Sequence, residues 1–256
     1  NNRLDNKFER FQNNLSKSNP SFSNISNEDE TKFRFNSNHN TNNYKFSFGG
    51  NFQLSNYINT SQYDFYNINY NSKIDFLKYG VFFKSSKSLI NDRLGISFGV
   101  RLDQDNFTLN NNIFENISPR IALSLKISDD NKWKLNFASG RYFKIPTYTS
   151  LGFKDSTGMF VNKNSKYTRS DHYVGGLEFN WTESSRFTFE AFYKKYNNYP
   201  ISFVDEVSIA NKGAGFEVLG NERISSEGKG KSYGLEFLYQ QKLKNNFYGI
   251  LSYTFF

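Results

Sequence analysis

The stretch Arg93-Leu-Gly-Ile-Ser-Phe-Gly-Val-Arg-Leu-Asp103 decides the fold, because its side chains alternate strictly between apolar ones and polar or small ones. The apolar side chains are Leu94, Ile96, Phe98, Val100 and Leu102. A period of two is that of a β-strand, whose successive side chains point to opposite faces. The stretch is about twice as long as a typical soluble strand, and it reaches the ~9–11 residues that a tilted strand needs to cross a membrane.

The same alternation recurs along the rest of the chain. It is found in residues 31–36, 44–54, 73–84, 118–127, 133–142, 172–181, 186–196, 232–242 and 247–255, with faults in 73–84 and 133–142. We therefore predict about ten antiparallel strands.

The connections between these segments alternate between short and long. The short ones are 37–42, 85–92, 128–131, 182–185 and 244–245, and the long ones are 55–72, 104–117, 145–169 and 201–230. Outer-membrane barrels have short periplasmic turns and long extracellular loops, whereas a soluble sandwich has no reason to sort its loops by end. The connections thus favour a membrane barrel.

The composition supports the same interpretation. Only 37% of the residues are hydrophobic, yet 19% are aromatic, whereas disordered chains are poor in aromatic residues. A transmembrane barrel combines both properties, because one face of each strand meets lipid, the other meets water, and aromatic girdles line the interfaces. The sequence has no run of about 18 apolar residues, which excludes a transmembrane helix, and residues 1–18 lack the apolar core of a signal peptide. We therefore expect a mature chain or a fragment.

Charge and residue types exclude several classes of function. The net charge is +8, but the basic residues are scattered along strands and Asn-rich loops, so we expect no nucleic-acid partner. The sequence has no cysteine, hence no thiolate metal site, and its two histidines, His39 and His172, have no second ligand near them in sequence. Alternation alone would also fit a soluble β-rich binding protein with its apolar face inward; strand length and loop sorting favour lipid.

Several segments occur in an informative order. They are Gly99-Val-Arg-Leu-Asp103, Ser118-Pro-Arg-Ile-Ala-Leu-Ser124 and Asn136-Phe-Ala-Ser-Gly-Arg-Tyr-Phe-Lys-Ile-Pro-Thr-Tyr148, followed by Tyr173-Val-Gly-Gly-Leu-Glu178, Phe189-Glu-Ala-Phe-Tyr-Lys-Lys195 and Ser232-Tyr-Gly-Leu-Glu-Phe237. Together they resemble the barrel of TonB-dependent outer-membrane receptors, and most of all members from Bacteroidota. The resemblance runs from about residue 31 to the end and rests on order and spacing rather than on one motif.

The resemblance implies an all-β fold: a transmembrane antiparallel β-barrel in the bacterial outer membrane, here about ten strands of a barrel of about 22. We expect residues 1–30 to form an extracellular loop or irregular segment and residues 31–256 a partial barrel. No plug domain or TonB box is visible in the sequence. About ten strands fall far short of a full barrel, so we expect an incomplete wall rather than a closed cylinder. The implied partners are outer-membrane lipid and lipopolysaccharide, the TonB complex reached through a plug, and a surface lipoprotein.

We expect no enzyme and no catalytic, cofactor-binding or metal site. Three carboxylates lie at alternating positions that belong to the polar face: Glu178, Glu190 and Glu236. We interpret them as solvated charges of the lumen and not as paired catalytic carboxylates. The enzyme alternative, a phospholipase or protease barrel, would need a Ser-His pair, and none is visible.

The leading hypothesis is a receptor that takes up a scarce substrate with energy delivered through TonB. A siderophore, haem, a vitamin, a glycan and a peptide all remain open as substrates. The alternative is a structural or accessory outer-membrane barrel that does not transport. The candidate substrate-facing residues of the wall are Arg101, Asp103, Arg120, Tyr142, Lys144, Lys194 and Tyr196, and those of the loops are Tyr148, Phe153, Phe160 and Tyr167.

Overall fold

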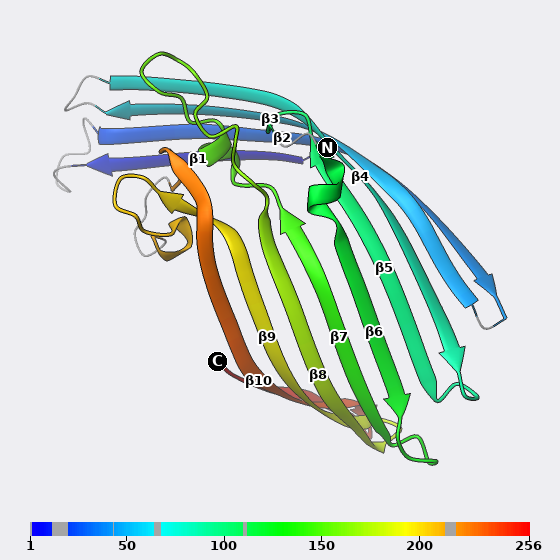
Figure 1. Ribbon diagram of the computed structural model, residues 1–256. Coiled ribbons are helices and arrows are strands. Elements are labelled where there is room, and N and C mark those ends of the chain that lie inside the picture. The colour runs from blue at the N-terminus through cyan, green and yellow to red at the C-terminus, as the bar shows by residue number, and fades with distance from the viewer. Residues whose placement is uncertain (1, 12–19, 43, 64–67, 110–111, 213–218) are drawn as a thin grey trace.

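The computed structural model describes residues 2–11, 20–42, 44–63, 68–109, 112–212 and 219–256. Within these residues the chain forms one sheet of eleven strands in sequence order, each pair of neighbours antiparallel, and the sheet curves like part of a cylinder wall (Figure 1). The strands are β1 (Asn2–Phe11), β2 (Pro20–Thr41), β3 (Tyr44–Tyr63), β4 (Ile68–Leu89), β5 (Leu94–Asp105), β6 (Ser118–Lys126), β7 (Trp133–Lys144), β8 (Thr168–Thr182), β9 (Ser185–Ser202), β10 (Ile224–Lys244) and β11 (Phe247–Phe255).

The helices lie in the connections. They are η2 (Ile113–Asn116), α1 (Tyr148–Leu151) and η3 (Ile209–Asn211). Among the described residues, no helix has the length and apolar character needed to cross a membrane. The described strands β1 and β11 are not paired with each other, so the sheet has two open edges. The expectation of an all-β barrel fragment with an incomplete wall is confirmed.

The cross-strand register keeps the apolar side chains on one face. Leu54 pairs with Leu77, Leu94 with Leu125, and Leu135 with Leu177. This apolar face is exposed, as the 62% exposure of Leu54 shows. The β7–β8 loop, residues 145–167, packs on the opposite face, which we call the inner face. Apolar side chains that point away from all packing suit a lipid environment, where backbone groups are paired within the sheet.

Several strands are longer than the alternation predicts, most of all at the ends that carry the long loops. Residues 1–30 were expected to form a loop, yet β1 and the first part of β2 lie there, and β3 and β4 extend into the predicted loop 55–72. We call residues 20–30 of β2, 55–63 of β3 and 68–76 of β4 the extensions. Hydrophobic alternation stops there because the outer face becomes largely polar, where Asn56 donates a hydrogen bond to Asp75. The inner face is mixed, with buried Ser55 and Asn59 beside buried Tyr57.

The other end of the sheet carries tight turns. Asn245 and Asn246 join β10 to β11 with φ of 50° and 61°. Two successive residues in the left-handed region form the turn that matches the twist of a hairpin, and asparagine tolerates that region better than most residues. The predicted long connections are present at 145–167 and 203–223. The predicted long connection 55–72 is wrong, because β3 continues to Tyr63 and β4 begins at Ile68.

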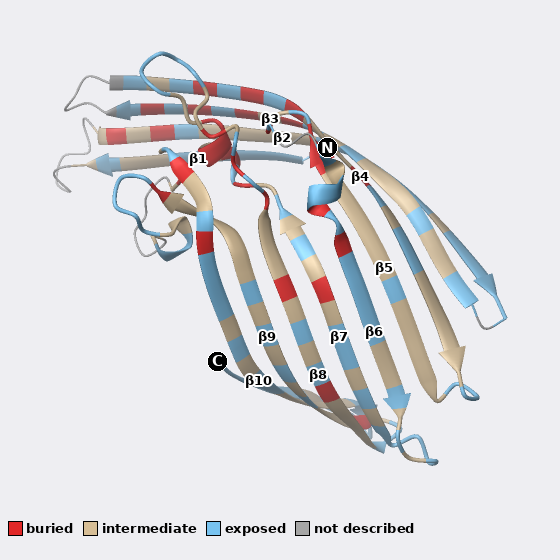
Figure 2. Ribbon diagram, viewed as in Figure 1, coloured by how far each residue is buried: buried red, intermediate tan, exposed pale blue. Residues whose placement is uncertain are grey.

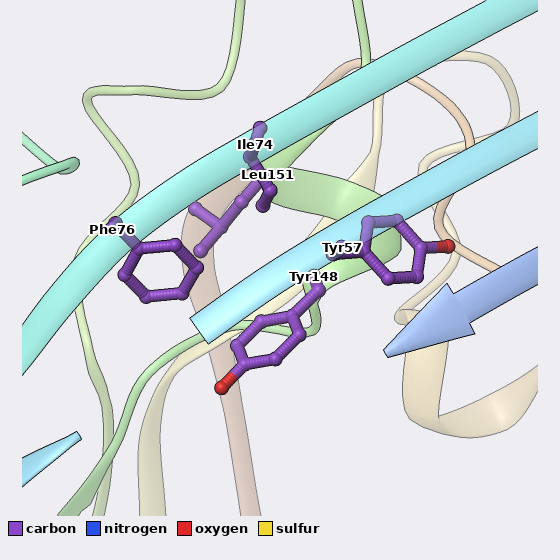
Figure 3. Close-up of a cluster of buried hydrophobic side chains, with 5 residues drawn as sticks. All are labelled: Tyr57, Ile74, Phe76, Tyr148 and Leu151. Atoms are coloured by element: carbon purple, nitrogen blue, oxygen red, sulfur yellow. The ribbon is translucent and has the colours of Figure 1, made fainter. Parts of the chain in front are cut away.

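The largest buried apolar cluster lies at the loop ends, where Figure 2 also shows most of the buried residues. We call it the mouth core. It consists of Tyr57, Ile74, Phe76, Tyr148 and Leu151, drawn in Figure 3, with Phe107, Ile145 and Phe160 packed against it. The cluster joins the extensions of β3 and β4 to α1, so it fixes the β7–β8 loop against the inner face of the sheet.

Polar contacts hold α1 from both sides. The Tyr70 hydroxyl donates to the carbonyl of Gly152 at 2.9 Å, and the Tyr148 hydroxyl donates to Glu30 Oε1 at 2.6 Å. Burial alone would raise the pKa of the Glu30 carboxyl. Hydrogen bonds from Lys32 and Tyr148, together with the charges of Lys78 and Lys32, outweigh burial and lower that pKa to about 2. Glu30 is therefore an ionised anchor for the loop.

Candidate functional site

A row of polar and small residues crosses the inner face near the middle of the strands. Cross-strand pairing places six residues of β4 to β9 on this inner row: Lys84, Gly99, Arg120, Gly140, His172 and Lys194. Four of them carry long basic or titratable side chains, and glycines separate three of these. The glycines leave room for the long side chains to lie along the wall.

Gly140 makes the clearest room for its neighbours. A Cβ built there would lie 3.1 Å from the Tyr142 ring and 3.2 Å from Cγ of Arg120. Without it, the Arg120 guanidinium carbon lies 4.4 Å from the Tyr142 ring centroid, a cation–π distance, and the rings of Tyr142 and His172 are 4.7 Å apart. His172 Nε2 lies 2.6 Å from Ser170 Oγ. Arg120, Tyr142 and His172 thus form one cluster on the wall.

A hollow of about 440 Å³ opens beside this cluster. Its charged and aromatic lining includes Arg34, Lys84, Arg101, Arg120, Phe82 and Tyr142, and the described lining contains no carboxylate. Arg101 is neutralised, because it pairs with Asp103 at 2.5 Å and donates to Asn51 at 2.6 Å. Among the described residues, no ion pair involves the other three cations. The hollow therefore presents unbalanced positive charge next to an aromatic face, which suits an anionic group.

A second hollow of about 710 Å³ lies closer to the turns. Small inner-face residues line much of it: Gly95, Ser97, Ala122, Ser124, Ala138 and Gly176. Glu190 adds a carboxylate. Because these side chains are small, they project little from the sheet, and another protein domain can pack close to the backbone here.

Comparison with known proteins identifies the sheet. The family model for the TonB dependent receptor-like β-barrel matches residues 1–256, the whole sequence. The chain belongs to this family. Its members are transport receptors of the bacterial outer membrane and not enzymes. The resemblance drawn from the sequence is confirmed at the level of the family, and an origin in Bacteroidota stays a prediction.

Solved structures share the fold at low sequence identity. The chain is similar to the copper transporter OprC, with a TM-score of 0.65 and 14% identity over 98% of this chain and 43% of that one. It is also similar to the siderophore receptor PirA from Pseudomonas aeruginosa (0.58, 15%, 91% and 43%) and to the alcaligin receptor FauA from Bordetella pertussis (0.52, 13%, 91% and 39%). This TonB-dependent receptor-like wall spans less than half of each chain. No protein of curated function matches it in sequence.

The receptor wall brings only some of the predicted wall residues together. Arg120 and Tyr142 are in contact, and Lys194 lies opposite His172 with its Nζ 4.8 Å from the Phe192 ring. Arg101 and Asp103 bind each other. The remaining two predicted residues lie nearer the loops: Lys144 ends β7 and is exposed, and Tyr196 packs edge-on against Tyr199 at 5.6 Å.

The predicted loop residues are taken up by packing in this conformation. Tyr148 and Phe160 belong to or pack against the mouth core, and Phe153 stacks on Tyr70 at 6.0 Å. Tyr167 is buried and donates a hydrogen bond to Asp105 Oδ2 at 2.8 Å. Their role in substrate contact stays a prediction, and it requires the β7–β8 loop to move.

Sequence reasoning missed three members of the wall: Arg34, Lys84 and His172. Each lies at an alternating position that belongs to the polar face, so the sequence already indicated that it faces the lumen. The register between neighbouring strands was missing, and only the register shows that Lys84 and Arg120 lie on the same line. Among the described residues, no group of three or more His, Asp or Glu is placed to hold a metal ion.

Proposed function

We propose that this wall belongs to an outer-membrane receptor that takes up a scarce, anionic substrate with energy delivered through the TonB complex. The unpaired cationic hollow of Arg34, Lys84 and Arg120 beside Tyr142 carries the proposal. In a lumen, a fixed cluster of cations raises the local concentration of anions and binds carboxylate, phosphate or catecholate oxygens. The copper and siderophore receptors named above are transporters of the same fold, which supports transport and leaves the substrate open.

The hollow of about 710 Å³ that is lined by small residues supports a plug domain as the internal partner of the wall. Gly95, Ala122 and Ala138 would let such a domain approach the backbone of the three neighbouring strands β5, β6 and β7. A plug is also the part through which TonB would act. A surface lipoprotein partner and the lipopolysaccharide of the outer leaflet complete the proposed surroundings.

Uptake tests this function in the full-length protein. We expect deletion of the gene, or of TonB, to abolish growth on one of a panel of ferric siderophores, haem, cobalamin or glycans as the scarce nutrient. Lys84→Gln with Arg120→Gln should raise the concentration of that nutrient needed for half-maximal growth at least tenfold. The control is Lys7→Gln with Lys73→Gln, which removes the same charge from exposed outer-face positions paired with Glu9 and Asp75.

Two results would count against the proposal. If the double variant grows as well as the control does, the hypothesis that an anionic substrate binds at this hollow is refuted. Growth indifferent to TonB on every nutrient would favour the alternative, an accessory barrel that does not transport.

A further inference from the structure

The outer face of β8 to β10 carries a row of tyrosines. Tyr173 pairs with Tyr193, and Tyr193 pairs with Tyr233, so the three rings lie side by side on neighbouring strands. All three are exposed, and the Tyr173 and Tyr193 rings are 6.4 Å apart. They lie on the same face of the sheet as Leu177 and closer to the loops than that residue. A line of tyrosines at the edge of an apolar face is typical of a membrane–water interface.

One pleat closer to the loops, the same face carries a row of charges. Cross-strand pairs join Arg141 to Asp171, Asp171 to Lys195, and Lys195 to Lys231. Arg169 lies next to this line, because its Nε donates to Asp171 Oδ2 at 3.0 Å while Arg141 Nε donates to Oδ1 at 2.7 Å. We call these five residues the outer row. Four cations share a single carboxylate.

The outer row is not balanced from within the sheet. Asp171 holds both guanidiniums, whereas Lys195 and Lys231 stand directly opposite each other, are exposed, and make no ion pair among the described residues. Like charges directly opposite on neighbouring strands are destabilising. An anion bound between the two lysines would relieve that repulsion.

The surface between the tyrosines and the apolar band is also suited to an acyl chain. Toward the turns from the tyrosine row, the outer positions are occupied by Phe137, Gly175, Ala191 and Leu235 in register. A Cβ built at Gly175 would meet nothing within 4 Å. Small residues flanked by Phe137 and Leu235 leave open apolar space on the turn side of the tyrosine row, and that row separates this space from the charges.

We propose that the outer row is a binding site for a phosphorylated lipid of the outer leaflet, with phosphate groups at Arg141, Arg169, Lys195 and Lys231 and an acyl chain over Gly175 and Ala191. Four neighbouring strands about 4.8 Å apart give the row a width of about 14 Å, enough for more than one phosphate. Guanidiniums held by Asp171 are pre-oriented to bind phosphate oxygens in pairs. The site is on the lipid side of the wall; it rests on the outer-membrane setting of the proposed function and is independent of which substrate the lumen takes.

The test uses the full-length receptor purified in detergent and native mass spectrometry. The probes are lipid A with two phosphates, the same lipid with its phosphates removed, and inorganic phosphate alone. We expect the intact protein to carry the phosphorylated lipid. Lys195→Gln with Lys231→Gln should lower the fraction of protein with bound lipid at least fivefold, and Lys195→Arg with Lys231→Arg should restore it. Lys7→Gln with Lys73→Gln is the charge-matched control.

Three outcomes would overturn the proposal. One is equal binding of the phosphorylated and dephosphorylated lipids. Another is equal loss in the Lys195 and Lys231 glutamine variant and in the control. The third is competition by millimolar inorganic phosphate, which would show a site for the free anion and not for the lipid. A loss of lipid binding with unchanged nutrient uptake would separate this site from the function of the lumen.

Discussion

Truncation of one leucine should release the β7–β8 loop from the wall. Leu151, the last residue of α1, is fully buried in the mouth core against the extensions of β3 and β4. Leu151→Ala removes buried methyl and methylene groups and leaves a cavity, which costs about 2.7–5 kcal/mol at fully buried sites. Because Leu151 joins the loop to the sheet and not one strand to another, we expect this cost to fall on loop docking. The lower value corresponds to about a hundredfold shift of the docking equilibrium.

Hydrogen exchange of the full-length protein in detergent measures that shift directly. The reporting amides are those of Leu151 and Gly152, which donate to Thr147 and Tyr148 in the docked loop. Their exchange should accelerate about a hundredfold at the lower cost, while exchange in the middle of β5 to β9 stays unchanged. Leu109→Ala is the matched control, because that leucine is 57% exposed and its loss should cost less than about 0.5 kcal/mol. Equal effects of the two variants, or faster exchange throughout the strands, would refute the idea that the mouth core docks the loop independently of the stability of the sheet.

Three further predictions follow from the orientation of the wall and from its charges. Phe98→Arg on the exposed apolar face should destabilise the barrel in lipid by about 2–4 kcal/mol, and Ser97→Arg beside the hollows should cost much less, as urea unfolding in vesicles would show; equal costs would contradict the lipid-facing assignment. A cysteine replacing exposed Ser156 should react with an impermeant reagent on intact cells and one replacing exposed Glu183 should not; labelling of the latter alone would invert the topology. Glu30 has a pKa lowered from 4.5 to about 2, so its stabilisation is present above about pH 4.5 and is lost as pH falls toward 2. Protease sensitivity of the β7–β8 loop should therefore rise on acidification, and Glu30→Gln should remove most of that dependence; an unchanged acid response in this variant would assign the effect to other groups.

The sequence predicted the part of each strand that meets lipid and missed the part that does not. Residues 44–54 alternate because one face is apolar, and the structure places them in β3. The same strand continues to residue 63, where the outer face carries polar side chains such as Asn56. The inner face of that part is buried but alternates polar and apolar side chains, Ser55, Tyr57 and Asn59. Hydrophobic periodicity cannot find a strand that has no consistently apolar face. This is also why β1 and the start of β2 were expected to be loop.

The candidate site shows a similar division. Parity alone placed Arg120 and Tyr142 on the inner face, and the structure brings them into contact. Alternation along one strand does not show which residue of the next strand lies opposite, so Lys84 was not recognised as part of the site. The burial of Tyr148 was also out of reach, because it depends on a loop folding back onto strands about 90 residues earlier in the chain, as its contact with Ser55 shows.

The inner row and the outer row lie on opposite faces of β7 to β9, and some of their residues are neighbours in sequence. Lys194 lies opposite His172 on the inner face, and Lys195 lies opposite Asp171 on the outer face. A shift of one residue in the register would exchange the two faces along a whole strand. The register of β9 and β10 is regular from Gly230 to Gln241, which keeps lumen charge and interface charge apart. The same substitution at the two lysines therefore samples two different surroundings: Lys194→Gln changes the wall of the lumen, and Lys195→Gln changes the outer row. A defect in substrate uptake from the first and in lipid binding from the second would be consistent with both proposals, whereas one shared defect would point to the stability of β9 and to neither site.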